Sequence, residues 1–161
     1  MSENIRFGFV AGVIGAVAID IYLVVTQSWI LHVATPVEIS QWDASNLLGR
    51  AAFFGGVATA LVGFVMNLCV GAAWGIIFAL AMRSPRLQHA QPLVLGIAFG
   101  TIVMLVMRYA VVPLGHAHQP HVDAPRLANL WLAHTIGFGI PVVLTFRRLC
   151  ARRLTTTHLA G

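Results

Sequence analysis

Long hydrophobic segments, separated by short polar stretches, make up most of this chain. A helix needs about 20 apolar residues to cross a hydrocarbon core of about 30 Å, and four segments are that long. They lie at residues 7–31, 53–82, 93–114 and 127–146. None of them shows the period-2 alternation that is typical of outer-membrane strands. The pattern therefore predicts an all-α, polytopic membrane protein with a bundle of four transmembrane helices.

The composition agrees with this class. Of the 161 residues, 58% are hydrophobic and 9% are charged, which leaves too little polar surface for a soluble domain of this length. We expect one membrane domain over residues 1–161. The sequence has no Ser/His/Asp or Cys/His arrangement and no glycine-rich phosphate-binding motif. An enzyme is therefore the least favoured class.

The arginines predict the orientation, because basic residues are retained on the cytoplasmic side of a membrane. Most of them fall on one side of the predicted spans: Arg6, Arg83, Arg86, Arg147, Arg148, Arg152 and Arg153. Arg50 and Arg126 fall on the other side. We predict cytoplasmic termini, with a cytoplasmic tail at 147–161. The absence of lysine is typical of a GC-rich bacterium, so the expected location is a bacterial inner membrane. Topology explains the net charge of +5, so the expected partner is the lipid bilayer and not nucleic acid.

Each hydrophobic segment carries one strongly polar residue: Asp20, Asn67, Arg108 and His134. Counted along helices at about 1.5 Å per residue, all four lie roughly 20 to 25 Å from the cytoplasmic ends of their segments. A polar group that faces lipid loses its hydrogen bonds to water. We therefore predict that the four side chains face one another in a buried polar network.

Small residues share the helix face of each polar residue. The stripes are Gly8, Gly12 and Ala16 with Asp20; Gly63, Gly71 and Gly75 with Asn67; Gly96 and Gly100 with Arg108; and Gly137 and Pro141 with His134. Small side chains allow the close backbone approach that drives helix association in lipid. The stripes predict that all four polar residues lie on helix-contact faces.

The first outward loop contains a helix-start signal. Thr35, Pro36 and Glu38 have the spacing of a capping box with proline at the first helical position. Ile39 and Trp42 follow at positions that fit an amphipathic helix. We predict a short interfacial helix in this loop, which either covers the outer side of the bundle or only connects two spans.

The polar network has three interpretations. In the first, which we prefer, Asp20 pairs with Arg108, because a lone charge at the bilayer centre costs about 2.5 to 3.5 kcal/mol. The chain is then a membrane scaffold or a subunit of a larger complex, and needs no cofactor. In the second, the network conducts protons or small ions in a homo-oligomer, with His134 as the titrating group. In the third, His134 ligates haem or a metal.

A second candidate site lies in the last outward loop. Three imidazoles and a carboxylate occur there within eight residues: His116, His118, His121 and Asp123. This is a suitable donor set for Zn(II) or Cu(II). The alternative is a solvated loop without metal, because Pro120 and Pro125 restrict how the ligands could converge.

Three segments carry a resemblance to a known family. They are VMLVMRYAVVPLG from Val103 to Gly115, AHTIGFGIPVVLTFRR from Ala133 to Arg148, and WDASNLLGRAAFFGG from Trp42 to Gly56. Together they resemble the uncharacterised YagU-like four-helix inner-membrane proteins of bacteria. The resemblance implies a four-span bundle with an outer loop that folds inward, and no established activity. Relatives often have histidine near the position of Asn67, so this chain lacks half of a histidine pair with His134.

Overall fold

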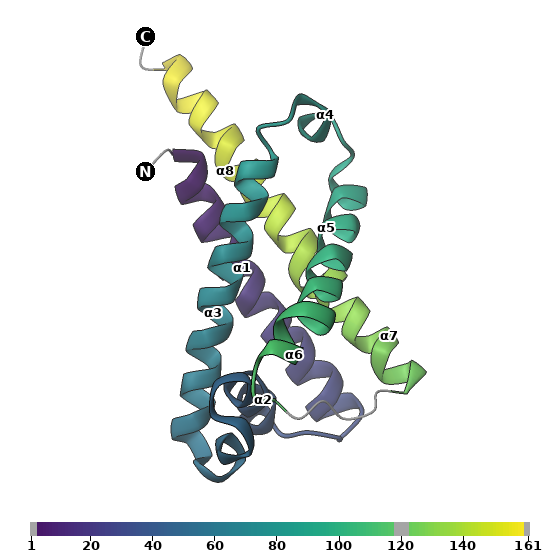
Figure 1. Cartoon of the computed structure of the whole chain (residues 1–161). Coiled ribbons are helices and arrows are strands. Elements are labelled where there is room, and N and C mark those ends of the chain that lie inside the picture. Colours follow the sequence, from purple (N-terminus) through teal and green to yellow (C-terminus); the bar gives the residue numbers. More distant parts are fainter. Residues whose placement is uncertain (1–2, 118–122, 160–161) are drawn as a thin grey trace.

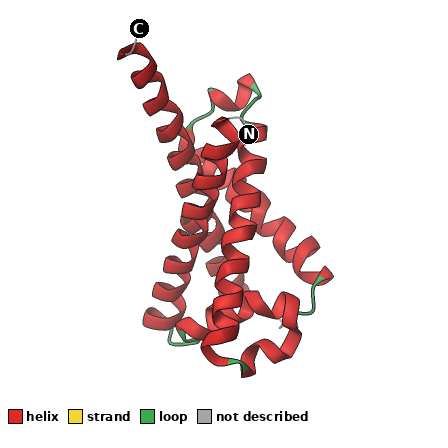
Figure 2. Cartoon of the chain, turned by 90° about the vertical axis from the view of Figure 1, so that its left-hand side faces the viewer, coloured by secondary structure: helices red, strands yellow, loops and turns green. Residues whose placement is uncertain are grey.

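The computed structural model describes residues 3–117 and 123–159 of the chain, and all secondary structure in these ranges is helical. Figure 2 shows helices joined by short loops. Within the same ranges, four helices are long and apolar enough to cross a membrane: Glu3–Ile30, Gly56–Ala81, Pro92–Leu114 and Ala124–Arg153. The predicted all-α class and the four apolar helices are confirmed.

Three of the four long helices change their winding along their length. The first consists of α1 (Glu3–Leu23) and the π-helical η1 (Val24–Ile30), and the second is α3 (Gly56–Ala81). The third consists of α5 (Pro92–Val106), the π-helical η3 (Met107–Val111) and α6 (Val112–Leu114). The fourth consists of α7 (Ala124–Leu132), the π-helical η4 (Ala133–Gly139) and α8 (Ile140–Leu159). The connections contain α2 (Pro36–Leu48), the 3-10 helix η2 (Gly49–Phe54) and α4 (Pro85–Gln88).

Both termini lie at the same end of the molecule, together with α4 (Figure 1). The opposite end holds α2, η2 and the ends of α6 and α7 that face the last loop (Figure 1). We call these the proximal and distal ends. Glu3 and Arg153 form an ion pair of 2.6 Å at the proximal end, which ties the first turn of α1 to α8. Helix α8 continues through most of the predicted tail at 147–161.

The predicted small-residue stripes mediate the closest helix packing. A Cβ atom at Gly12 would overlap the backbone of Gly71, and one at Gly75 would overlap the backbone of Gly8. Helix α1 therefore packs on α3 at backbone distance. Gly100 meets the backbone of η4 in the same way. Contact along the glycine faces is confirmed for these three spans.

One stripe serves two different partners. Gly71 and Gly75 of α3 face α1, whereas a Cβ at Gly63 would overlap the backbone of Ser40 on α2. The proximal half of α3 thus packs against a long helix and its distal half packs against α2. This division places α2 directly against α3 at the distal end.

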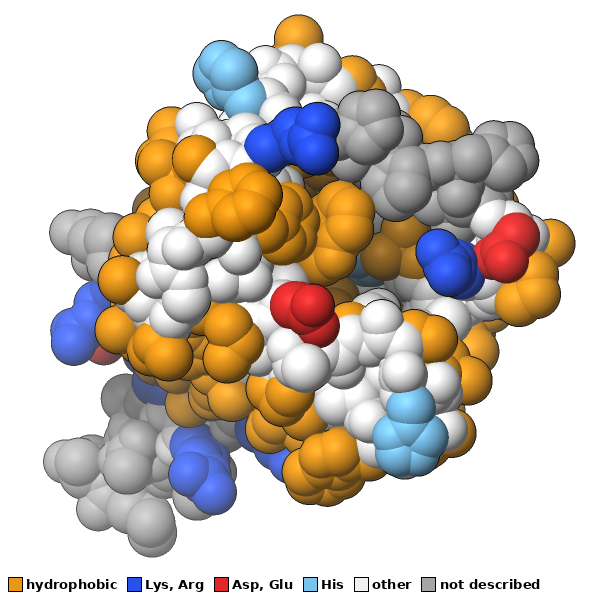
Figure 3. All heavy atoms as spheres, turned by 90° about the horizontal axis from the view of Figure 1, so that it is seen from below, with side chains coloured by type: hydrophobic (Ala, Val, Ile, Leu, Met, Phe, Trp, Pro, Cys, Tyr) orange, Lys and Arg blue, Asp and Glu red, His pale blue; other side chains and the backbone are white. Residues whose placement is uncertain are grey.

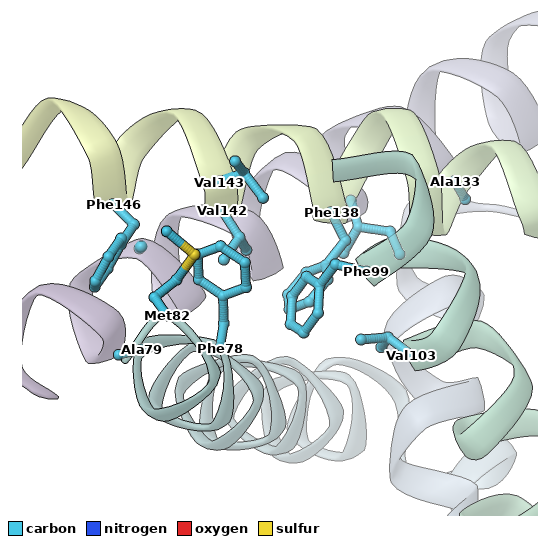
Figure 4. Close-up of a cluster of buried hydrophobic side chains, with 12 residues drawn as sticks. Phe78, Ala79, Met82, Phe99, Val103, Ala133, Phe138, Val142, Val143 and Phe146 are labelled. Carbon is cyan, nitrogen blue, oxygen red and sulfur yellow. The ribbon is translucent and has the colours of Figure 1, made fainter. Parts of the chain in front are cut away.

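Aromatic side chains fill the proximal half. The ring centroids of Phe78 and Phe99 are 4.9 Å apart, and those of Phe78 and Phe146 are 5.5 Å apart. Phe99 stacks on Phe138 at 6.1 Å. These rings come from α3, α5, η4 and α8, and they point toward one another with Val142 and Met82 beside them (Figure 4). The proximal half is therefore a closed apolar core.

Two helix boundaries differ from the predicted spans. The second helix begins at Gly56 instead of near residue 53, because Gly49 and Gly56 have φ values of +58° and +57°. Only glycine adopts this backbone readily, so the chain turns twice before α3 starts. The first helix begins at Glu3 and not near residue 7. The ion pair between Glu3 and Arg153 supports this additional turn.

Candidate functional site

A cavity of about 440 Å³ lies in the distal half, between η1, α2, the η3–α6 segment and α7. Figure 3 shows the distal face, which is hollowed between apolar side chains with acidic and basic groups nearby. Among the described residues, the polar ones that line the cavity are Gln27, Asp43, Asn46, Arg108, Arg126 and Asn129. Its volume is in the range of small-molecule sites, and a few polar groups on an apolar wall are typical of such sites.

Helix α2 is positioned by a capping box at its start and by a hydrogen bond on its buried face. The Thr35 backbone N–H donates to Glu38 Oε2 at 2.7 Å, and the Glu38 N–H donates to Thr35 Oγ1 at 3.2 Å. The predicted capping box is thus confirmed, with Pro36 at the first helical position. On the buried face, Gln41 Nε2 donates to Gly56 O at 2.9 Å. This bond holds α2 against the start of α3 and leaves Asp43 and Asn46 on the cavity wall.

Asp43 is the most perturbed acid outside the spans. Burial, and secondarily the nearby Asp20 carboxylate, raise the pKa of Asp43 from 3.8 to about 8. The two carboxylates come from α2 and α1, so α2 brings an acid of the first connection close to the first long helix. An acid with this pKa is protonated at neutral pH in the empty cavity and can release its proton near physiological pH.

The structure brings Asp20 and Asn67 together. Asn67 Nδ2 donates to the Ala16 carbonyl at 3.1 Å, and the Asn67 amide also interacts with the Asp20 carboxylate. Asp20 Oδ2 is buried and has no hydrogen-bond partner among the described residues. This half of the predicted polar network therefore lies at the α1–α3 contact, on the proximal side of the cavity.

Arg108 lies on the cavity wall instead of beside Asp20. Its guanidinium carbon is 5.9 Å from the centre of the Tyr109 ring. Within the described ranges, the ion pairs closer than 4.0 Å are Arg126–Asp123 and Arg153–Glu3, so the expected Asp20–Arg108 pair is not formed. The physical reason is helix order, since α1 packs against α3, η4 and α8, whereas α5 packs against η4 and α8.

His134 is bonded within its own helix. Its Nδ1 lies 2.9 Å from the Leu130 carbonyl oxygen, a bond that requires the Nδ1-protonated tautomer. The backbone carbonyl of His134 faces Gly100 of α5. No described hydrogen bond joins His134 to Asp20, Asn67 or Arg108. The structure therefore separates the four predicted residues into three places.

The π-helical segments were not predicted from the sequence. Arg108 lies in η3 and His134 lies in η4, while η1 begins four residues after Asp20 and carries Gln27. Such segments are rare and often occur at functional sites. Threonine within a hydrophobic span is the available signal: the hydroxyls of Thr26 and Thr135 donate to backbone carbonyls four residues earlier, a bond that bends helices.

Residues on the cavity wall were also missed. Tyr22 Oη donates to Asn129 Oδ1 at 3.1 Å and so ties α1 to α7 beside the cavity. Asp43, Asn46 and Arg126 fall in segments that the hydrophobic pattern assigns to loops. Asp43 and Asn46 are three residues apart in the predicted short helix, so they share one face, and this spacing could have marked them as a polar wall.

The structure describes two of the four residues in the predicted metal site, His116 and Asp123. His118 and His121 lie outside the described residues. Asp123 caps α7 by accepting from the Arg126 N–H at 3.1 Å, and the His116 N–H donates to the Asn46 carbonyl at 2.9 Å. Within residues 3–117 and 123–159, no three His, Cys, Asp or Glu side chains form a group that could hold a metal ion.

No protein-family model, no curated protein and no solved structure matches the chain. The resemblance to YagU-like proteins therefore stays a prediction.

Proposed function

We propose that the chain is a multi-pass protein of a bacterial inner membrane, with its four spans in one bundle and its termini in the cytoplasm. The proximal end, where Arg83 and Arg86 lie with the arginines of α8, is then cytoplasmic. The distal end faces outward, and α2 lies at the outer interface. Large apolar side chains on the spans, such as Ile21 and Leu61 at 59% exposure each, then contact lipid.

Within this frame, the chain acts as a membrane-embedded binding subunit for a small ligand that enters from the outer side. The observation that supports this function is the distal cavity of about 440 Å³, where charged and amide side chains from four elements converge on an apolar wall. A purely structural scaffold accounts for the Asp20–Asn67 contact at the α1–α3 interface. It gives no reason for Asp43, Arg108 and Arg126 to line an open space.

A continuous proton or ion pathway is less well supported. An aromatic core fills the proximal half, between the cavity and the proximal end. It consists of Phe78, Phe99, Phe138 and Phe146. A pathway would require these rings to move, whereas binding from one side does not. A haem or metal at His134 also has less support, because no group of three His, Cys, Asp or Glu side chains that could hold a metal occurs among the described residues. The Nδ1–H bond to the Leu130 carbonyl leaves Nε2 as the ligand atom, as is usual in metal-bound histidines, so this bond does not argue against such a group.

Cysteine accessibility tests whether the cavity opens outward. In a background with Cys69 and Cys150 replaced by serine, Asn46→Cys places a thiol on the cavity wall. We expect a membrane-impermeant methanethiosulfonate to label Asn46→Cys in intact cells. Leu61→Cys, which faces lipid in the second span, is the matched control and should stay unlabelled. Labelling of Asn46→Cys only in inside-out vesicles would contradict an outward opening.

Ligand retention tests the binding function itself. Purified protein in nanodiscs is dialysed against a pool of bacterial small metabolites, and retained compounds are identified by mass spectrometry. Ala34→Trp, which adds a large side chain to the cavity wall, serves as the blocked variant. We expect the wild type to retain a compound that Ala34→Trp does not. Identical retention by both proteins would reject the function.

A further inference from the structure

The charges on the cavity wall are separated by element. The acidic side is made by Asp43 on α2, with Asp20 of α1 close enough to perturb it. The basic side is made by Arg108 on η3 and Arg126 on α7. Figure 1 shows that α2 and α7 lie apart at the distal end, with α6 between them in this view. The cavity is therefore polarised, with an acidic wall and a basic wall.

The Asp43 carboxyl group and the two arginines do not form ion pairs with each other. Within the described residues, no ion pair closer than 4.0 Å joins Asp43 to either arginine, and Arg126 makes only an exposed contact of 3.9 Å with Asp123. A molecule that lies between the two walls can therefore offer a cation to one and an anion to the other. Charge-assisted hydrogen bonds of this kind are among the strongest that a site offers, and arginine suits carboxylate and phosphate groups.

The rest of the cavity wall is apolar, so a ligand needs an apolar group in addition to a cation and an anion. The side chains between the charged walls include Leu23, Leu31, Ile39, Trp42, Val112 and Leu130. A fully polar ligand would leave this surface without favourable contacts, whereas a ligand with an aliphatic or aromatic group would bury it. The amide groups of Asn46 and Asn129 add hydrogen-bonding capacity, and Asn46 Oδ1 is buried with no partner among the described residues.

We propose, on the basis of the binding function above, that the cavity takes a small zwitterion with an apolar group, such as an amino-acid-like molecule. Its ammonium group lies against Asp43, its anionic group lies against Arg108 and Arg126, and its apolar group lies on the apolar wall between them.

This geometry couples binding to proton release. The charged or titratable groups on the elements around Asp43 are Asp20 on α1, Glu38 on α2, Arg50 on η2, Arg108 on η3, His116 after α6 and Arg126 on α7. Helix α3 carries Cys69, α1 and η3 also carry Tyr22 and Tyr109, and η1 carries no titratable group. In the empty cavity Asp43 is protonated at neutral pH, because its pKa is about 8. A bound ammonium favours the carboxylate, so binding at neutral pH releases a proton, on the order of one per ligand.

A set of four probes of matched shape tests the ligand class. L-Leucine is zwitterionic, 3-methylbutylamine keeps only the ammonium, 4-methylpentanoate keeps only the carboxylate, and 4-methylpentanamide is uncharged. Binding is measured by calorimetry on the full chain in nanodiscs. We expect L-leucine to bind at least about tenfold more tightly than any of the other three, since each lost charged contact costs about that much. Calorimetry in buffers of different ionisation enthalpy should detect proton release with L-leucine but not with 4-methylpentanoate.

Three variants assign the ends of the ligand. Asp43→Asn should weaken L-leucine about tenfold, abolish proton release and leave 4-methylpentanoate unchanged. Arg108→Gln should weaken 4-methylpentanoate and leave 3-methylbutylamine unchanged, and Arg126→Gln at the exposed rim tests the same role if Arg108→Gln does not fold. Arg50→Gln is the matched control, because Arg50 lies on a neighbouring hollow and not on this cavity.

The outcomes separate the ligand class from the binding function. Equal affinity for all four probes, with loss of binding in Ala34→Trp, would overturn the zwitterion and keep the binding function. Retention of a different compound from the metabolite pool, without binding of any probe, would do the same. If neither the pool nor any probe yields a compound whose binding depends on Ala34, the binding function itself fails.

Discussion

Single residues decide how the distal cavity responds to pH. Asp43 occupies a segment that hydropathy assigns to a loop, yet it lies beside Asp20 with a pKa of about 8. Its charge is unfavourable in the folded protein for two reasons, loss of water and proximity to a second carboxylate. The neutral form relieves both, so the folded chain binds a proton here that the unfolded chain releases.

Asp43 should therefore make the folded protein less stable as pH rises. Between the ordinary value of 3.8 and about 8, the folded state binds more protons than the unfolded state, so stability falls with increasing pH and levels off above about 8. The slope is at most about 1.4 kcal/mol per pH unit. Thermal unfolding of wild type and Asp43→Asn in detergent, from about pH 5 to pH 9, checks this. The difference in Tm between the two should grow with pH, and a constant difference would contradict it.

A second residue-scale contact holds the proximal connection. Arg147 Nη2 donates to the Ala90 carbonyl at 2.6 Å and to the Leu87 and Gln88 carbonyls at 3.3 Å each. Leu87 and Gln88 are the last two residues of the short helix α4, and Ala90 lies in the turn that follows it. One guanidinium therefore fixes the turn between α3 and α5.

Arg147→Met should loosen this turn while preserving the side chain's apolar volume. Hydrogen bonds from a charged donor contribute about 1.5 to 3 kcal/mol, and the strongest of these bonds is partly buried, so the turn should open more often. Limited trypsin digestion of inside-out vesicles reports the opening, because Arg83 and Arg86 flank Pro85 in the same turn. We expect faster cleavage there in Arg147→Met than in Arg148→Met, the exposed neighbour. Equal rates would show that Arg147 does not hold the turn.

At the scale of helices, the small-residue stripes could be predicted and the positions of the polar residues could not. Spacing alone placed Gly12 and Gly71 on contact faces, because close approach in lipid needs small side chains wherever the partner lies. Which helix is the partner depends on the order of helices around the assembly. Asp20 and Arg108 have the same predicted depth, but α1 packs mainly on α3, η4 and α8 and α5 packs mainly on η4 and α8. Depth along a helix carries no information about this order.

For the short helix α2, the sequence also predicts the local structure but not the packing partner. Its start at Thr35, Pro36 and Glu38 follows from local hydrogen bonding, so the sequence was sufficient to predict it. Its insertion against Gly63 depends on a contact with a segment more than twenty residues away, which local patterns do not encode. Asp43 was therefore assigned to a loop away from the long helices, and the cavity wall was missed.

Close packing of α1 on α3 should be sensitive to a single methyl group. Gly12→Ala places a Cβ atom against the Gly71 backbone, which cannot move without shifting α3. Overpacking of this kind costs about 1 to 3 kcal/mol. Val17→Ile adds one carbon on an exposed face of the same helix and should change little. Thermal unfolding in detergent compares the two variants, and equal Tm values would argue against direct helix contact at Gly12.

For the whole molecule, the separation of an apolar proximal half from a distal half with a cavity gives the proposed membrane topology a testable direction. The arginines near the termini predict that the proximal half is cytoplasmic. Phe54, 85% exposed at the distal end, and His89, exposed beside α4, are suitable positions for single cysteines in the Cys69→Ser, Cys150→Ser background. An impermeant thiol reagent should label Phe54→Cys but not His89→Cys in intact cells, and the pattern should reverse in inside-out vesicles. The opposite pattern would turn the cavity toward the cytoplasm, and its ligand would then have to come from inside the cell.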